Sequence, residues 1–293
     1  MEIVLLGTGC PQCDPERRGP ANLVRAGALR FLVDCGSGVT QRLVEAGTRG
    51  ADIDALFLTH LHTDHLVDFY QLVVSSWHQG RARGWRVFGP PGTRDFVAGT
   101  MALWAAERAQ RIAHEKRASV AAFDIDVTEI GPGTAWDEGG VRVTAVAVAH
   151  APVRHAFGYV FEAGGHKAAF SGDTAYCLDL IAAARDADVL VHECFVHAEM
   201  KPVAGVRSAE TVAAVESYHT RSDEVGRVAR EAGARFLLLN HFVPTRFDRH
   251  AVLDEVARDF AGPVAIGEDL MRYDIAARRL VHRDGVVALG TRA

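Results

Sequence analysis

The sequence predicts an α/β protein that forms one domain with layered sheets over residues 1–293. Short apolar runs of strand length alternate with helical patterns along nearly the whole chain. No repeat of roughly 20–50 residues and no low-complexity linker interrupts this alternation. The stretch Gly131–Gly140 is interpreted as a boundary between two halves, not between independent domains.

Each expected strand is a short apolar run that ends in a polar or glycine-rich loop. The first three are Ile3–Leu6, Leu29–Asp34 and Ala55–Thr59. Further strands are expected at Arg86–Phe88, Val141–Ala149, Gly158–Phe161, Lys167–Ser171, Val189–His192, Phe236–Asn240 and Val264–Ile266. Helical patterns fill the intervals at Val39–Ala46, Val67–Trp77, Arg94–Lys116, Leu178–Ala184, Ala209–Tyr218, Asp223–Ala232 and Ala251–Phe260.

Composition is that of a soluble globular protein, with 48% hydrophobic and 24% charged residues. The 32 lysine and arginine residues face 37 aspartate and glutamate residues, and the net charge of −5 argues against a protein that coats nucleic acid. The longest apolar stretches, such as Phe236–Asn240, are far shorter than the roughly 18 residues of a membrane span. The N-terminus lacks the features of a signal peptide, so we expect a cytoplasmic protein with no membrane partner.

The five cysteines do not indicate a disulfide framework, because their number is odd and the chain is large. Cys10 and Cys13 have the spacing of a redox or zinc motif. A second such pair is missing, and a proline follows where a redox motif would open a helix. We therefore interpret Cys10 and Cys13 as two loop thiols.

A dense cluster of histidines follows the third expected strand, in the segment Thr59-His60-Leu61-His62-Thr63-Asp64-His65. Two residues that leave a strand at positions i and i+2 project side by side and can share one metal ion. Asp64 and His65, at the start of the next helix, can turn toward a second ion. Imidazole and carboxylate suit zinc, iron or manganese, so these residues do not fix the metal.

Three more polar residues follow later strands in the same way. His150 ends one strand, Asp173 follows another, and His241 follows the strand Phe236–Asn240. In α/β folds, the carboxyl ends of strands are where functional sites lie. Together with the first cluster, these residues provide five histidines and two aspartates, enough for two metal ions with one shared carboxylate.

This pattern resembles the metallo-β-lactamase superfamily, whose signature is HxHxDH followed by a later His, Asp and His. The resemblance extends over nearly the whole chain and implies a four-layer αββα sandwich with the metals at one edge of the sheets. It implies His60, His62 and His150 for one metal, Asp64, His65 and His241 for the other, and Asp173 as the bridge. The Gly7-Thr8-Gly9 loop and Asp34-Cys35-Gly36 also match, and Asp34 would orient the histidines from behind.

Within the superfamily, the sequence is most similar to the branch of ribonuclease Z and the arylsulfatase-like hydrolases. The supporting segments are Phe88–Gly92, Phe157–Tyr159, Ser171–Thr174, Val191–Glu193, His219-Thr220 and His241-Phe242 with Arg246. The resemblance implies that His219 and Glu193 handle the proton of the leaving group. Ribonuclease Z carries a long arm before the segment that matches Ser171-Gly172-Asp173, but here only Glu162–Ala169 separates the two strands.

From these features we expect a dinuclear hydrolase with two zinc ions, or manganese or iron in their place, that directs a hydroxide at a small phosphodiester, sulfate ester or carboxylic ester. Asp64, His219 and Glu193 are the expected catalytic residues, and Arg246 is expected to hold an anionic oxygen of the substrate. Because the arm is missing, we do not expect tRNA as a partner. We expect a small-molecule ester as the substrate, and a homodimer.

Four alternatives remain open at this point. Two are enzymes with the same type of metal centre: a lactonase or β-lactamase-type amide hydrolase, and a tRNA 3′ processing endonuclease. A di-iron redox protein would usually carry Glu in place of His62 and a flavin domain. A non-catalytic metal-binding or RNA-binding protein is disfavoured because no ligand of the signature is missing.

Overall fold

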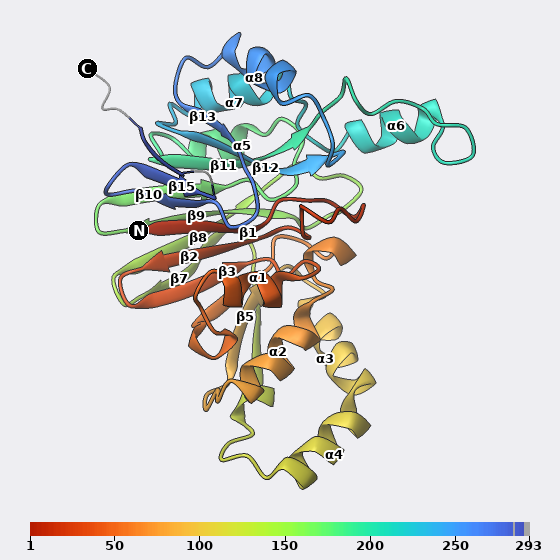
Figure 1. Ribbon diagram of the computed structural model, residues 1–293, viewed down its shortest axis with the longest axis vertical. Helices are drawn as coiled ribbons and strands as arrows, with labels where there is room; N and C mark the ends of the chain where they lie inside the picture. Colours follow the sequence, from red (N-terminus) through yellow and green to blue (C-terminus); the bar gives the residue numbers. More distant parts are fainter. Residues whose placement is uncertain (284, 290–293) are drawn as a thin grey trace.

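The computed structural model describes residues 1–283 and 285–289. Two stacked sheets form the centre of the molecule, and helices cover the outer face of each sheet (Figure 1). This arrangement confirms the expected α/β class and the four αββα layers. None of the helices in the described residues has the length and the apolar surface that crossing a bilayer requires.

The first sheet has the strand order β16-β15-β14-β1-β2-β3-β4-β5-β6. Its strands are β1 (Glu2–Gly7), β2 (Ala21–Ala26), β3 (Leu29–Val33), β4 (Ala55–Phe57), β5 (Trp85–Gly89), β6 (Ile125–Glu129), β14 (Arg272–Asp274), β15 (Arg279–His282) and β16 (Gly285–Ala288). Strands β3 to β6 run parallel to one another, and the remaining pairs are antiparallel.

The second sheet has the order β13-β12-β11-β10-β9-β8-β7. Its strands are β7 (Gly133–Glu138), β8 (Val141–Ala147), β9 (Phe157–Ala163), β10 (His166–Phe170), β11 (Val189–Phe195), β12 (Leu237–Val243) and β13 (Val264–Ile266). Strands β10 to β13 are parallel, so their carboxyl ends meet at one edge. The hairpin between β9 and β10 is closed by Gly164 and Gly165, which both adopt positive φ angles.

The outer layers are formed by amphipathic helices. The first sheet is covered by α1 (Val39–Glu45), α2 (Phe69–His78) and α3 (Thr93–Leu103), and α4 (Ala105–Glu115) extends beyond α3. The second sheet is covered by α5 (Leu178–Ala183), α7 (Val225–Glu231) and α8 (Arg249–Ala257). Helix α6 (Ala209–Glu216) projects away from the sheets (Figure 1). Short 3₁₀ turns occur at Gly50–Asp52, Thr63–His65 and Ala121–Phe123.

An aromatic core fills the space between the two sheets. The Phe57 ring on β4 lies 5.0 Å from Phe88 on β5, and 5.4 and 5.7 Å from Tyr159 and Phe161 on β9 of the other sheet. Each fully buried side chain of this size contributes about 1.5–3 kcal/mol relative to an exposed one. This core fixes the two sheets against each other, and therefore fixes the edge where their loops meet.

The structure differs from the expected helices and strands in three ways. The expected helix Arg94–Lys116 is two helices, because the chain turns at Trp104, which has φ −102° and ψ 15°. The strand expected to end at Thr59 ends at Phe57, since the Thr59 amide donates to the Asp34 side chain instead of to a neighbouring strand. Strands β2, β6, β7, β14, β15 and β16 were not expected at all.

All five cysteines are free thiols, and Cys13 is exposed. Cys10 is buried in a small cluster with Phe195 and Val243. Burial, together with the nearby carboxylates of Asp64, Asp173 and Asp14, raises the pKa of the Cys10 thiol to about 11. A thiol that stays protonated is a poor nucleophile and a poor metal ligand, in agreement with its interpretation as a loop thiol.

Candidate active site

The residues of the HxHxDH signature lie in the loop between β4 and α2. The buried His60 leads into the loop, and the 3₁₀ turn Thr63–His65 brings Asp64 and His65 back toward it. On the second sheet, His150 follows β8 and Asp173 follows β10. The two sheets therefore contribute the two halves of one cluster.

His241 differs from its expected position. It lies inside β12 and not after it, since the strand continues to Val243. The register pairs Glu193 with Asn240 and Cys194 with Phe242, so His241 has no partner in β11. Its φ angle is +42°, a left-handed conformation that is uncommon for a residue with a side chain. A bulge of this kind redirects a side chain, here toward the cluster.

The structure brings all seven expected ligands together in two groups. Within each group the ligand atoms lie within 4.8 Å of one another; the groups are His60, His62, His150 and Asp173, and Asp64, His65 and His241. Asp173 Oδ2 lies between them, 3.4 Å from His65 Nε2 and 3.3 Å from His241 Nε2. It also lies 3.9 Å from His60 Nε2. This central position is the one that a bridging carboxylate requires.

The side chains fit divalent cations. His60 Nε2, His65 Nε2 and Asp173 Oδ1 are buried and make no hydrogen bond within the described residues. Buried polar atoms without a partner are costly, so such a concentration of them needs an explanation. Imidazole nitrogens and carboxylate oxygens facing one centre are the donor set that zinc, manganese and iron accept.

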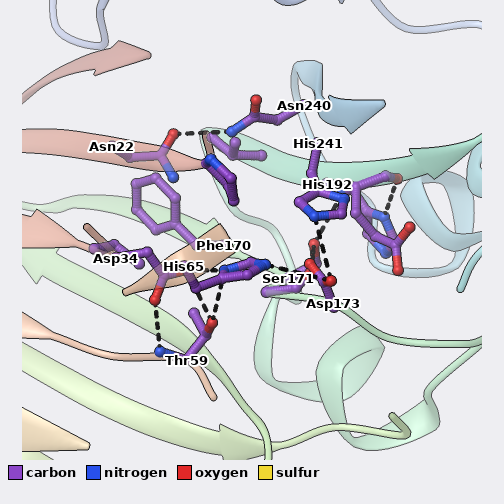
Figure 2. Close-up of a pocket in the computed structure, with 15 residues that line it drawn as sticks. Asn22, Asp34, Thr59, His65, Phe170, Ser171, Asp173, His192, Asn240 and His241 are labelled. Atoms are coloured by element: carbon purple, nitrogen blue, oxygen red, sulfur yellow. Dashed lines mark hydrogen bonds and ion pairs between the residues drawn. The ribbon is translucent and has the colours of Figure 1, made fainter. Parts of the chain in front are cut away.

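Hydrogen bonds from behind hold three of the histidines in one orientation. His65 Nδ1 donates to Asp34 Oδ2 at 2.8 Å (Figure 2). Thr59 Oγ1 donates to the same carboxylate and lies 3.0 Å from His60 Nδ1. His150 Nδ1 lies 2.9 Å from the carbonyl oxygen of Tyr218. In each case Nδ1 contacts an oxygen atom outside the cluster, and Nε2 faces Asp173 Oδ2, at 3.9 Å for His60, 3.4 Å for His65 and 4.0 Å for His150. His150 Nε2 also lies 3.3 Å from His62 Nδ1.

Electrostatics divide the histidines into two classes. Burial lowers the pKa of His60 well below its usual value and that of His150 to about 4, so both are neutral and ready to bind a cation. Burial acts in the same direction on His65, but Asp173, Asp34 and Asp64 overcome it and raise the pKa of His65 well above its usual value. Asp34 and Asp173 thus lie on opposite sides of the His65 ring, at 2.8 Å from Nδ1 and 3.4 Å from Nε2.

His219 and Glu193 form a buried pair beside the cluster. His219 Nδ1 lies 2.8 Å from Glu193 Oε1, and the amide of Thr174 donates to the same oxygen at 2.8 Å. Burial alone would lower the pKa of His219, but the Glu193 carboxylate raises it to about 9. The His219 ring is 5.4 Å from that of His150 and 5.7 Å from that of His241. Burial also raises the pKa of the Glu193 carboxyl, so a proton is held between His219 and Glu193 at the edge of the two groups.

A family model described as the β-lactamase superfamily domain matches residues 29–242, which include every residue of the two groups. The chain belongs to the metallo-β-lactamase superfamily.

Relatives and solved structures indicate the branch of the superfamily to which the chain is most similar. The chain is 35% identical to the ribonuclease Z of Mycobacterium bovis BCG over 286 residues, covering 95% of this chain and 100% of the relative. It is 36% identical to that of Mycobacterium marinum, with the same coverage. The short form of human tRNase Z superposes with a TM-score of 0.70 at 23% identity, covering 94% of this chain and 99% of that one. YhfI from Bacillus subtilis gives 0.71 at 21% identity, covering 93% and 98%. This superfamily member is a metal-dependent hydrolase of the ribonuclease Z-like branch.

The relatives overturn the expected partners. A small-molecule ester as substrate, with tRNA excluded, is wrong, because the matched relatives are ribonucleases Z. The absence of a long arm does not argue against ribonuclease Z. The match to the Mycobacterium bovis relative spans 286 residues and covers 100% of that relative, so that relative has no long arm beyond what this chain has. The net charge of −5 describes the whole chain and not the surface around the site.

Arg246 lies in the loop between β12 and α8. Its side chain is 82% exposed, and Nε pairs with Asp14 Oδ2 at 3.1 Å. Asp14 is in turn held by Thr245 and by the amide of Glu16. The hydrolase therefore keeps the outer end of this guanidinium in solvent, and its expected contact with substrate stays a prediction.

Several residues that support the site were not found from the sequence. Thr59 directly precedes the signature, and nothing in the motif indicates that its hydroxyl connects Asp34 to His60. Tyr218 acts through its carbonyl oxygen, which any residue would supply. Asn22 and Asn240 bond to each other across the two sheets and are 218 positions apart in sequence. Such contacts depend on packing, so no local pattern could have predicted them.

Proposed function

We propose that this hydrolase is an RNA phosphodiesterase of the ribonuclease Z type, which removes the 3′ trailer of precursor tRNA. The observation that carries the proposal is the 35% identity to ribonuclease Z over 95% of the chain. The pairing of His219 with Glu193 supports it, because an alkoxide leaving group needs a proton donor. The expected cytoplasmic location is in accord with such a substrate.

His60, His62 and His150 are proposed to hold one ion, Asp64, His65 and His241 the other, and Asp173 both. Two zinc ions are proposed, although the same donors suit manganese or iron. Divalent ions at such a site supply Lewis acidity, which lowers the pKa of a water nucleophile and offsets charge on the phosphoryl oxygens. The distances of Asp173 Oδ2 to histidines of both groups support its bridging role.

The protein's own side chains would complete the reaction. Asp64 faces the shared centre and, beyond holding a cation, can accept a proton from the attacking water. His219 is proposed to donate a proton to the departing oxygen, and the Glu193 carboxylate keeps that proton on the imidazole. Arg246 is proposed to hold an RNA phosphate, supported by its exposed guanidinium five residues after His241.

The test is cleavage of a transcribed precursor tRNA with a 3′ trailer, with products sized on a sequencing gel. We expect one cut near the 3′ end of the acceptor stem, its loss on chelation, and its return with added zinc or manganese. Asp173→Ala should lose at least one metal by elemental analysis and nearly all cleavage. Asp137→Ala, at an exposed carboxylate of β7, is the matched control. Wild-type protein that binds both metal ions but cleaves no precursor tRNA would refute the proposal.

A further inference from the structure

A buried amide pair joins the two sheets beside His241. Asn22 lies on β2 of the first sheet and Asn240 on β12 of the second, and both side chains are buried. Asn240 Nδ2 donates to Asn22 Oδ1 at 3.1 Å (Figure 2). The core between these sheets is otherwise largely apolar and aromatic, so two amides there are exceptional. The catalytic residues described above do not use them.

The bulge in β12 places Asn240 and His241 beside one cavity. Successive side chains of a regular strand point to opposite faces, but His241 is the extra residue of the bulge and breaks this alternation. Both side chains therefore line the same space, a cavity of about 30 Å³ that is also bordered by Asn22 and His65. A cavity this size exceeds the roughly 10–15 Å³ that one water molecule needs.

His241 lacks the outer hydrogen bond that the other buried histidines possess. Its Nε2 faces Asp64 and Asp173, at 3.4 and 3.3 Å from their Oδ2 atoms. Its Nδ1 is buried and makes no hydrogen bond within the part of the chain that the structure describes, and the same holds for Asn240 Oδ1. A histidine that binds a metal almost always donates its outer N–H to a carboxylate, a carbonyl oxygen or a water.

We propose that Asn22 and Asn240 are positioning residues for His241, acting through one buried water. The water accepts a hydrogen bond from His241 Nδ1 and donates one to Asn240 Oδ1, while Asn22 holds the Asn240 amide in the orientation that presents this oxygen. The contact fixes the His241 tautomer with the proton on Nδ1 and leaves Nε2 for the cation. It rests on the proposed role of His241 as a metal ligand.

The test compares metal affinities of the folded holoenzyme and the double variant Asn22→Ala/Asn240→Leu. This change removes both amides, nearly conserves their combined volume and places an apolar group where the water would lie. Competition with a chromogenic chelator gives the affinity of each ion, and cobalt substitution gives the visible absorption of each site. We expect the ion at Asp64, His65 and His241 to bind about 10–100-fold more weakly, with an altered cobalt spectrum.

Ser76→Ala is the control, since Ser76 is a buried polar residue of α2 that bonds to Val73 and Trp85 and not to the cluster. It should leave both affinities unchanged. If the double variant does not fold by circular dichroism, Asn22→Ala alone must lower the affinity of the same ion. Unchanged affinities and an unchanged cobalt spectrum in the folded variant would contradict the proposal and show that the amide pair only connects the two sheets. A wild-type protein that binds no second ion would instead refute the proposed function.

Discussion

At the scale of single residues, two neighbouring histidines of the site have different pKa values because their Nδ1 atoms contact different groups. His150 and His219 are neighbours, with ring centroids 5.4 Å apart. His150 meets a neutral carbonyl oxygen, so burial dominates and lowers its pKa to about 4. His219 meets the Glu193 carboxylate, which raises its pKa to about 9. The two imidazoles therefore have opposite pKa shifts, in accord with the proposed roles of His150 as a metal ligand and of His219 as a proton donor.

His219→Ala separates proton delivery from metal binding. We expect unchanged metal content and a fall in kcat of about 10²–10⁴ on RNA, the usual contribution of a general acid. The loss should be far smaller on bis-nitrophenyl phosphate, since nitrophenolate departs without a proton. His250→Ala, at an exposed histidine of α8, should change neither quantity. Equal losses on both substrates, or loss of metal, would contradict the general-acid role.

The same pair should also give a pH-dependent stability. His219 has a pKa raised above its usual value of 6.5, so its pairing with Glu193 stabilises the fold fully below pH 6.5 and loses this effect as the pH rises to about 9. Glu193→Gln removes the charge but keeps the shape. In chelator-treated protein, we expect urea unfolding to show a wild-type advantage on the order of 2 kcal/mol at pH 6 that narrows by pH 9. A constant difference across this range would show that His219 and Glu193 do not form an ion pair in the folded protein.

At the scale of elements, the turn after β10 shows how backbone geometry places a ligand. Gly172 has a φ of +58°, and a Cβ at this position would lie 2.6 Å from the Phe157 carbonyl oxygen and 3.2 Å from Thr59. The turn therefore needs glycine twice over, for its conformation and for its close approach to the neighbouring segments. Asp173 follows directly, so its position depends on this contact.

Gly172→Ala tests this dependence against a matched glycine. Gly164, in the β9–β10 turn, has the same φ of +58° but open space around it. Gly164→Ala should cost only the backbone strain, about 1 kcal/mol of unfolding free energy. Gly172→Ala should cost roughly 2–4 kcal/mol, because the clash adds to the strain, and should weaken metal binding. Similar losses in both variants, with metal content intact, would show that the turn adjusts freely.

The elements that could be predicted from the sequence are those with a local signal. Strand β1 is an apolar run and β11 begins with one, and α7 ends at Glu231, two residues before the Gly233 stop signal. By contrast, β14 and β15 are short and rich in charged residues, and they exist because Tyr273 pairs with Ile3 at the other end of the chain. The proposed ligands could be named from the sequence because most of them follow strands in a known motif, and the structure brings them close together. The bulge at His241 was not, since it depends on the register with β11.

At the scale of the whole molecule, the two sheets meet at the proposed metal site as well as in the aromatic core. The first sheet supplies His60, His62, Asp64 and His65, and the second supplies His150, Asp173 and His241. The carboxylates of Asp64 and Asp173 are both buried, and Oδ2 of each lies 3.3–3.5 Å from Nε2 of His65 and of His241. Cations at this edge would thus link the two halves of the fold.

Removal of the metals should therefore destabilise the whole molecule and not only the site. A ligand present at about 100 times its Kd adds about 2.7 kcal/mol to the free energy of unfolding per site. For a chain of this size, each kcal/mol shifts Tm by about 2–4 °C, so chelation should lower Tm by roughly 5–10 °C per ion lost. Hydrogen exchange should rise at the carboxyl ends of β4, β10 and β12 together, because one cluster holds all three. Asp173→Ala should have a lower Tm than the wild type, and chelation should lower it further by less than it lowers the wild-type Tm. A Tm that is indifferent to chelation in the wild type, with bound metal shown by elemental analysis, would mean that the sheets are held by the core alone.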